Sequence, residues 1–234
     1  MLEIQIQRIR NEIYECALAC NRKMEEIKII AVTKTHPISL IKEVLENDID
    51  FIAESRVQDA EEKIPKLVGL YEEFHFIGQL QSNKINRLLE LRPTLIHSVD
   101  NFTTAKTISN FSKKRDIVQD ILIEVNTSGE ASKIGIKPSE CSELIKRVKD
   151  LENVKIKGLM TIGAFVEDDE VIRKCFITLR ELFEKEKTKN KSTVEMKYLS
   201  MGMSSDFKLA IQEGSNMLRL GSILFGERNH HKSR

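Results

Sequence analysis

The sequence predicts a single-domain (β/α)8 TIM barrel, an α/β fold whose wall is made of parallel strands, with an extra N-terminal helix. Three observations support this fold. Short apolar runs alternate with stretches of helical spacing along the whole chain. The length of 234 residues is ordinary for such a barrel. No GxGxxG turn follows an early strand, which disfavours the main alternative, a doubly wound open sheet with a dinucleotide site.

The first element is a helix over residues 2–23, where apolar residues recur at helical spacing. Eight strand-like runs follow, at 28–33, 50–53, 74–78, 95–99, 121–126, 156–162, 197–202 and 217–221. Helical stretches separate them, at 38–47, 57–70, 82–91, 101–114, 138–151, 168–188 and 205–213. Strands that alternate with helices form mainly parallel sheets with crossover helices. We therefore expect the barrel over residues 1–228 and a polar tail over residues 229–234.

The composition is that of an ordinary globular protein, with 41% hydrophobic and 31% charged residues. The net charge of +1 gives no support for a nucleic-acid partner. No apolar stretch has the length of a membrane span. The N-terminus is acidic and amphipathic, which disfavours a signal peptide. We therefore expect a cytoplasmic protein and a monomer.

The cysteines fit a reducing compartment. They are Cys16, Cys20, Cys141 and Cys175, and none forms a CxxC pair. No histidine lies at metal-ligand spacing from them, so we expect no metal site and four buried, structural thiols. The adjacent His230 and His231 lack further ligands in the polar tail, which disfavours a metal there.

The chemistry is organised around Lys34, which closes the apolar run 29–33. Such a run is typical of a strand buried on both faces. Functional residues of (β/α)8 barrels lie where strands end, and residues 35–37 end this strand. Partial burial would lower the pKa of the Lys34 amine and make it a nucleophile for Schiff-base formation. The alternative is a lysine whose stem is buried and whose amine reaches solvent.

Serines and glycines follow the last two strands. They are Ser200, Gly202, Ser204 and Ser205 at and after the end of the seventh strand, and Gly221 and Ser222 at and after the end of the eighth. Hydroxyls, close backbone approach and free N–H groups at a helix start suit a phosphate, and these two loops often bind phosphate in such barrels. Taken singly, Ser204 and Ser205 also fit helix capping, and Gly221 fits a tight turn. Their coincidence after adjacent strands favours phosphate binding.

A phosphate site together with an amine nucleophile indicates a phosphorylated aldehyde as ligand, and pyridoxal 5′-phosphate (PLP) fits best. Its aldehyde would condense with Lys34, and Arg219 would point into the barrel mouth near the pyridine nitrogen. Because arginine stays protonated and only donates, it would keep that nitrogen unprotonated. The alternative for Arg219 is a salt bridge with a barrel carboxylate such as Glu54.

Polar residues elsewhere leave two interpretations open. Asn83 and Asn126 either contact the cofactor ring or tie loops together. Lys84 and Lys133 are either a relay for incoming cofactor or solvated loop lysines. His75, on the third predicted strand, fits a hydrogen-bonded core histidine better than an acid–base group.

At these positions the chain resembles the pyridoxal phosphate homeostasis protein family. The resemblance runs from Lys28 to Arg228. It rests on AVTK at 31–34, HFIGQLQSNK at 75–84, GLM at 158–160, SMGMS at 200–204 and RLGS at 219–222. It implies a fold similar to the barrel domain of alanine racemase and of the fold-type III decarboxylases.

The resemblance also implies roles for single residues. Lys34 matches the Schiff-base lysine, and Arg219 matches the arginine that faces the pyridine nitrogen. The segments that hold the phosphate contain Ser200, Gly202, Ser204, Gly221 and Ser222. We expect the rest of the cofactor site to include Asn83, Asn126, Met160 and Ser55. The family usually has Gly-Glu-Asn after the second strand; this chain has Ala53-Glu54-Ser55, and Ser55 lacks the amide of that asparagine.

Members of the family look like carriers or regulators of the cofactor pool. A racemase needs a second base on the opposite face of the cofactor, and no tyrosine or cysteine stands at a predicted strand end. We therefore expect PLP and PLP-dependent apo-enzymes as partners, and no catalytic residue. The alternatives are a PLP-dependent amino-acid racemase or decarboxylase of fold type III, and a Schiff-base aldolase acting on a sugar phosphate.

Overall fold

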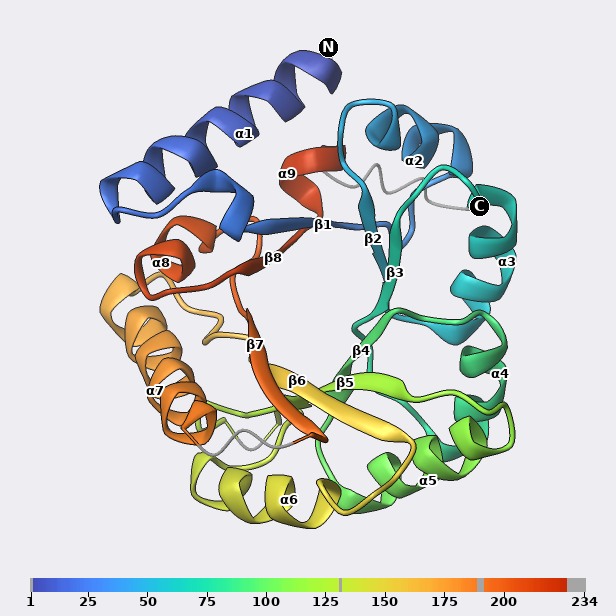
Figure 1. The fold of residues 1–234 in the computed structure, drawn as a ribbon. Coiled ribbons are helices and arrows are strands. Elements are labelled where there is room, and N and C mark those ends of the chain that lie inside the picture. The colour runs from blue at the N-terminus through green and yellow to red at the C-terminus, as the bar shows by residue number, and fades with distance from the viewer. Residues whose placement is uncertain (1, 131, 189–191, 227–234) are drawn as a thin grey trace.

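A closed barrel of parallel strands forms the centre of the computed structural model, which describes residues 2–130, 132–188 and 192–226. Each strand pairs with the next, and β1 also pairs with β8 (Figure 1). The strands are β1 (Lys28–Val32), β2 (Phe51–Glu54), β3 (Glu73–Phe76), β4 (Leu95–Val99), β5 (Gln119–Glu124), β6 (Val154–Met160), β7 (Val194–Ser200) and β8 (Met217–Leu220). The predicted (β/α)8 fold is confirmed.

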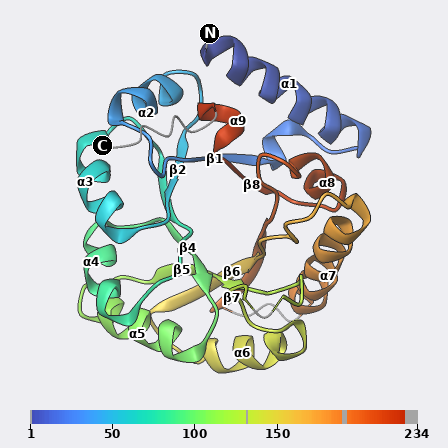
Figure 2. The ribbon, with the colours of Figure 1, turned by 180° about the vertical axis from the view of Figure 1, so that it is seen from behind.

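Helices surround the barrel and connect its strands (Figure 2). They are α1 (Leu2–Ala19), α2 (Ile38–Leu45), α3 (Val57–Leu67), α4 (Ile85–Glu90), α5 (Phe102–Lys113), α6 (Cys141–Val148), α7 (Asp169–Lys187), α8 (Phe207–Gln212) and α9 (Ser222–Phe225). Single 3-10 turns precede β1, α4 and α6, namely η1 (Met24–Glu26), η2 (Ser82–Lys84) and η3 (Pro138–Glu140). Helix α1 is the expected extra helix, and it packs outside the barrel against α2, α8 and α9.

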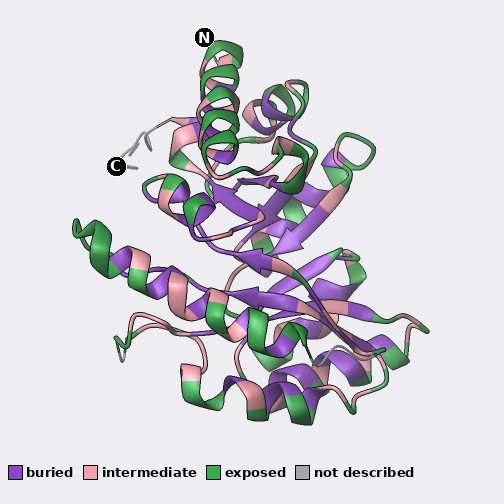
Figure 3. Ribbon diagram, turned by 60° about the vertical axis from the view of Figure 1, so that its left-hand side comes forward, coloured by how far each residue is buried: buried purple, intermediate pink, exposed green. Residues whose placement is uncertain are grey.

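Two hydrophobic layers hold the barrel together. The larger layer lies between the strands and the helices, and α1 contributes Ile6, Ile9 and Ile13 to it. A smaller layer fills the barrel interior, with Ile30, Ala53, Leu95, Leu122, Met160 and Met217. Figure 3 shows the strands buried along most of their length, while the helices expose their outer faces. Burial on both faces explains the near-continuous apolar runs that identified the strands.

Three strands begin two or three residues earlier than predicted: β5 at Gln119 rather than 121, β6 at Val154 rather than 156, and β7 at Val194 rather than 197. The first residues of β6 alternate between buried and partly exposed, which interrupts the apolar run. The partly exposed Lys155 and Lys157 pair with Glu195 of β7, at Nζ–Oε2 distances of 2.9 and 2.7 Å. These ion pairs extend the strands beyond the segment that apolarity alone predicts.

The thiols differ in part from expectation. Cys141 and Cys175 are buried as predicted, but Cys16 and Cys20 are only half-buried, because they flank the face of α1 that packs on the barrel. All four thiols are free. In the described part of the chain, no cluster of histidine, cysteine, aspartate and glutamate could hold a metal ion. The tail at 229–234, with its two histidines, lies outside the described residues.

No helix within the described ranges combines the length and the apolarity that crossing a bilayer requires.

Candidate functional site

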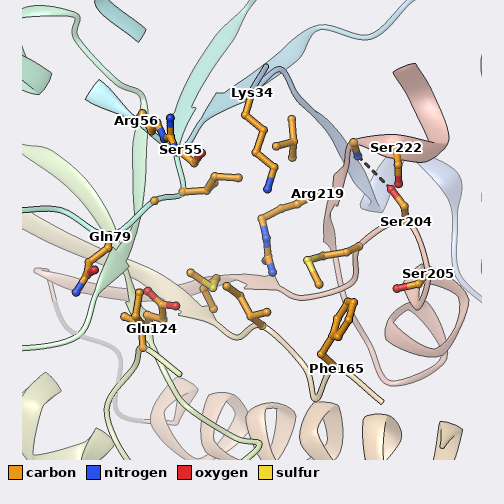
Figure 4. Close-up of a pocket in the computed structure, with 18 of the residues that line it drawn as sticks. Lys34, Ser55, Arg56, Gln79, Glu124, Phe165, Ser204, Ser205, Arg219 and Ser222 are labelled. Atoms are coloured by element: carbon orange, nitrogen blue, oxygen red, sulfur yellow. Dashed lines mark hydrogen bonds between the residues drawn. The ribbon is translucent and has the colours of Figure 1, made fainter. Parts of the chain in front are cut away.

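A cavity of about 640 Å³ opens at the carboxyl ends of the strands. Barrels of this kind place their chemistry at this end. The predicted site residues that line the cavity are Lys34, Ser55, Met160, Ser204, Arg219, Gly221 and Ser222. Figure 4 shows the side chain of Lys34 pointing towards Arg219, with Ser204 and Ser222 to one side of that pair and Ser55 to the other. The structure therefore gathers residues from the first, second, sixth and last two β/α units.

Lys34 follows β1 and is held in place through its neighbour Thr33. The Thr33 N–H donates to the Ala53 carbonyl at 2.9 Å, and the Thr33 hydroxyl donates to Glu54 Oε1 at 2.7 Å. On the other side of Lys34, Thr35 has a φ of +67°, a left-handed conformation that is rare for a β-branched residue. The fixed strand end and the sharp turn after it set the position from which the half-buried Lys34 side chain enters the cavity.

Arg219 lies on β8 and is 4% exposed. Its Nη1 donates to Ser200 Oγ at 2.6 Å, and its Nη2 donates to the Thr161 carbonyl at 2.8 Å. Burial lowers the pKa of Arg219 to about 10, so the guanidinium stays charged at neutral pH. The alternative salt bridge to Glu54 is wrong. The carboxylate of Glu54 instead accepts from Lys63 Nζ of α3 at 2.8 Å, because it lies on the helix-facing side of β2.

Ser204 brings the loop after β7 onto the start of α9. Its Oγ accepts the backbone N–H groups of Gly221 and Ile223, both at 3.2 Å. It does not cap α8, whose N-cap residue is Asp206. The predicted alternative of capping the next helix is therefore wrong for Ser204. Ser204, Gly221 and Ser222 thus lie together at one wall of the cavity, where two hydroxyls are the neutral polar groups of the side chains.

Ser200 and Gly202 do not line the cavity. Ser200 is fully buried inside the barrel, because β7 ends at this residue and its hydroxyl points inward to Arg219. Gly202 has a φ of +96°, and a Cβ there would lie 2.6 Å from the Ala210 Cβ. A side chain at position 202 would therefore collide with α8, which explains the glycine by packing.

Asn83 and Asn126 also lie away from the cavity lining. Asn83 is exposed on η2. The Asn126 amide donates to the carbonyls of Glu130 and Lys133, at 2.8 and 3.1 Å, and so ties its own loop together. For Asn126, the loop-tying interpretation is the one that the contacts support.

The two lysines with open roles differ from each other. Lys133 is not a solvated loop lysine: its Nζ donates to the Gly163 carbonyl at 2.9 Å and pairs with Glu130 at 2.8 Å. Lys84 is partly buried and lines a neighbouring pocket of about 480 Å³, which shares Ser55 and Gln79 with the main cavity. The interpretation of His75 as a hydrogen-bonded core histidine is confirmed, since it is fully buried and both ring nitrogens have partners.

Ser205, which was considered together with Ser204, also lines the cavity. The other lining residues were not predicted, namely Val32, His36, Arg56, Ile77, Gly78, Gln79, Glu124, Ile134, Ile162, Phe165, Met203 and Gly226. Glu124 is the chemically informative one, because a carboxylate at the end of an apolar strand is unusual. The single acidic residue in the run Ile-Leu-Ile-Glu-Val is the sequence signal that could have found it. Phe165 is 89% exposed at the cavity rim, where a large apolar side chain is not expected from burial alone.

Glu124 should make the stability of the cofactor-free protein depend on pH. Burial raises the pKa of Glu124 to about 7, whereas an unfolded glutamate has a pKa of about 4.3. Because the unfolded chain loses this proton first, folding stability falls as pH rises from about 4.3 to about 7. Glu124→Gln should therefore be more stable than the wild type above pH 7, by up to roughly 3 kcal/mol.

Urea unfolding at acidic and alkaline pH tests this prediction. The stability difference between Glu124→Gln and the wild type should grow with pH, and replacement of the exposed Glu72 by glutamine is the control for the loss of one carboxylate elsewhere. A pH-independent difference for Glu124→Gln would contradict the raised pKa.

The fold and the site define a barrel of the class found in alanine racemases. The family model described as alanine racemase, N-terminal domain, matches residues 4–229. A pyridoxal phosphate homeostasis protein of Aquifex aeolicus is 38% identical over 226 residues, covering 97% of this chain and 98% of the relative. One of Helicobacter pylori strain 26695 is 41% identical over 202 residues, covering 86% and 88%. The chain therefore belongs to the pyridoxal phosphate homeostasis protein family.

A solved structure of PipY from Synechococcus elongatus PCC7942 with PLP bound is similar to this fold. The TM-score is 0.83 at 26% identity, and the match covers 97% of this chain and 100% of PipY.

Proposed function

We propose that this protein holds PLP as a Schiff base on Lys34 and takes part in homeostasis of the cytoplasmic PLP pool, by buffering or delivery, without catalytic turnover. One observation carries the proposal: Lys34, Arg219 and the donors around the start of α9 line a single cavity. The names of the two relatives, and the PLP bound in the PipY structure, support PLP as the ligand. When bound, PLP supplies an aldehyde that an amine can attack.

The residues of the cavity fit such a ligand. The cavity volume of about 640 Å³ is within the range of small-molecule sites. The hydroxyls of Ser204 and Ser222 are suited to the phosphate, and a phosphate oxygen that takes the place of Ser204 Oγ would accept from the Gly221 N–H as well. We assign the aldehyde to Lys34, whose side chain points towards Arg219 between Ser55 and the two serines. We assign Ser55 and Met160, which also line the cavity, to the ring.

Arg219 supports a role in binding PLP rather than in catalysing a reaction with it. Its charged guanidinium only donates hydrogen bonds, so a ring nitrogen that faces it stays unprotonated. An unprotonated pyridine nitrogen makes the cofactor a weak electron sink, which slows carbanion chemistry. We assign Ser200 to holding Arg219 and Gly202 to packing, and we assign Asn83 and Asn126 no contact with the cofactor.

Borohydride reduction tests the attachment. The protein mixed with PLP should show an absorption band in the near-visible range, and reduction should fix one phosphopyridoxyl group on the peptide that contains Lys34. A label on another lysine, or no label, would contradict the proposal. The aldolase alternative predicts that the reduced label comes from a sugar phosphate and not from PLP.

Delivery and turnover need separate tests. The loaded protein, mixed with a PLP-dependent apo-enzyme, should restore the activity of that enzyme. If no activity is recovered, delivery of PLP is ruled out and buffering is the role that remains. A racemase or decarboxylase would exchange the α-hydrogen of an amino acid with solvent deuterium, or release carbon dioxide. We expect neither from the loaded protein, and either result would replace the carrier proposal with the enzyme alternative.

A further inference from the structure

A chain of hydrogen bonds crosses the barrel interior from Arg219 to the far end of β3. Arg219 Nη1 lies 2.6 Å from Ser200 Oγ, and Ser200 Oγ lies 3.1 Å from His97 Nδ1. His97 Nε2 lies 2.8 Å from His75 Nδ1, and His75 Nε2 lies 2.8 Å from Glu73 Oε2. Each of the three residues between the two ends is fully buried. The chain therefore joins the cavity at the carboxyl ends of the strands to Glu73, the first residue of β3.

The direction of these hydrogen bonds follows from their carboxylate end. The Glu73 carboxylate only accepts, so the proton of the neutral His75 ring lies on Nε2 and donates to it, which leaves His75 Nδ1 to accept from His97 Nε2. Because the proton of the neutral His97 ring then lies on Nε2, His97 Nδ1 accepts from the Ser200 hydroxyl. Arg219, which only donates, donates to Ser200 Oγ. Every bond thus points from Arg219 towards Glu73.

The charges along the chain are consistent with this order. Burial lowers the pKa of His75 and holds the pKa of His97 well below its usual range, and the latter also faces the Arg219 charge. Burial acts to raise the pKa of Glu73, but hydrogen bonds from His75 and Lys28 outweigh it and bring that pKa to about 2. Both rings are therefore neutral at pH 7, and the terminal carboxylate is ionised.

We propose that Ser200, His97 and His75 are positioning residues for Arg219, and that Glu73 fixes the donor order of the whole chain. The carboxylate can only accept from His75, so each ring has one tautomer and Ser200 keeps a lone pair towards Arg219. The guanidinium is thereby held against Ser200 and the Thr161 carbonyl, with its remaining N–H groups left for the cavity. The effect on bound PLP rests on the proposed function; the order of the chain does not.

Nitrogen NMR of the cofactor-free protein tests the order directly. Long-range correlation spectra distinguish a protonated from an unprotonated ring nitrogen, and His75 and His97 should both show a protonated Nε2 and an unprotonated Nδ1. Both rings should titrate at a lower pH than an ordinary histidine. A protonated Nδ1 on either ring at neutral pH, or a pKa of either ring above that of an ordinary histidine, would overturn the proposal whether or not PLP binds.

Ser200→Ala tests the positioning of Arg219. The His97 Nδ1 signal should move to that of an unbonded nitrogen, the absorption band of bound PLP should shift, and PLP should bind on the order of tenfold more weakly. The matched control is Ser112→Ala, since Ser112 is also fully buried but its hydroxyl has no partner among the described residues. The control should change none of these readouts. Unchanged His97 and PLP signals in Ser200→Ala would overturn the positioning role.

Glu73→Leu tests the remote end of the hydrogen-bond chain. Leucine offers no acceptor to His75 Nε2, so the His75 signals should shift and the PLP band should move in the same direction as in Ser200→Ala, by less. If wild-type protein fails to bind PLP, the proposed function fails, while the His75 signals still decide the order of the hydrogen bonds. If PLP binds and Glu73→Leu leaves both rings unchanged, the anchoring role of Glu73 fails.

Discussion

Replacing Lys34 with alanine should abolish covalent loading with PLP. The absorption band of the loaded protein should disappear, borohydride should fix no label, and any remaining binding should be weaker by on the order of 100-fold or more. The physical reason is that the cavity keeps its donors for the phosphate but loses the amine that captures the aldehyde. Equilibrium dialysis and mass spectrometry after reduction measure the two effects.

The matched control is Lys42→Ala. Lys42 is exposed on α2, the helix that follows Lys34, so its loss tests the effect of removing one nearby charge. It should load with PLP as the wild type does. A reducible label that persists in Lys34→Ala would assign the attachment to another amine and overturn the site.

Replacing Lys63 with alanine should destabilise the fold by about 3–5 kcal/mol, because it leaves a buried carboxylate without its cation. Glu54 is fully buried, and Lys63 Nζ of α3 donates to its Oε1 at 2.8 Å. The same ammonium donates to the Thr33 carbonyl at 2.8 Å, one residue before Lys34. Lys63→Ala should therefore also weaken PLP loading. Urea unfolding and PLP titration measure the two consequences.

Two further variants separate the ion pair from other effects. Lys66→Ala lies on the same helix with its side chain 58% exposed, and it should change stability by less than about 0.5 kcal/mol. The double variant Glu54→Leu/Lys63→Met replaces both charges by apolar groups and should recover most of the lost stability. Equal losses in Lys63→Ala and in the double variant would show that packing of the lysine stem, and not the pair, is responsible.

The sequence allowed the fold and the centre of the site to be predicted, because both depend on local patterns. Strands buried on both faces leave apolar runs, and Lys34, Gly221 and Ser222 are visible as the residues that follow such runs. Arg219 was found because it lies near the end of the eighth predicted strand, in the RLGS motif that carries the resemblance. None of these predictions required knowledge of which residues meet across the barrel.

The remaining site residues depend on register and on contacts distant in sequence. Ser200 was assigned to the phosphate as part of the serine and glycine segment at the end of the seventh strand; β7 ends at Ser200, and the hydroxyl of this residue turns inward to Arg219. Glu124 was missed because only the pairing of β5 with its neighbours sets which of its residues face the cavity. The alternative that paired Glu54 with Arg219 was wrong, since the cation that contacts Glu54 is Lys63 of α3, on the helix-facing side of β2.

The pairing of β1 with β8 has a consequence for how the protein acquires its ligand in the cell. Residues 28–31 find their partners at 217–220, so the wall beside Lys34 stays incomplete until almost all of the described chain has been synthesised. A growing polypeptide on the ribosome holds the amine long before it holds the guanidinium and the serine that face it across the cavity. PLP is therefore expected to bind only after synthesis has passed β8. Truncated translation products that lack β8 should bind no PLP.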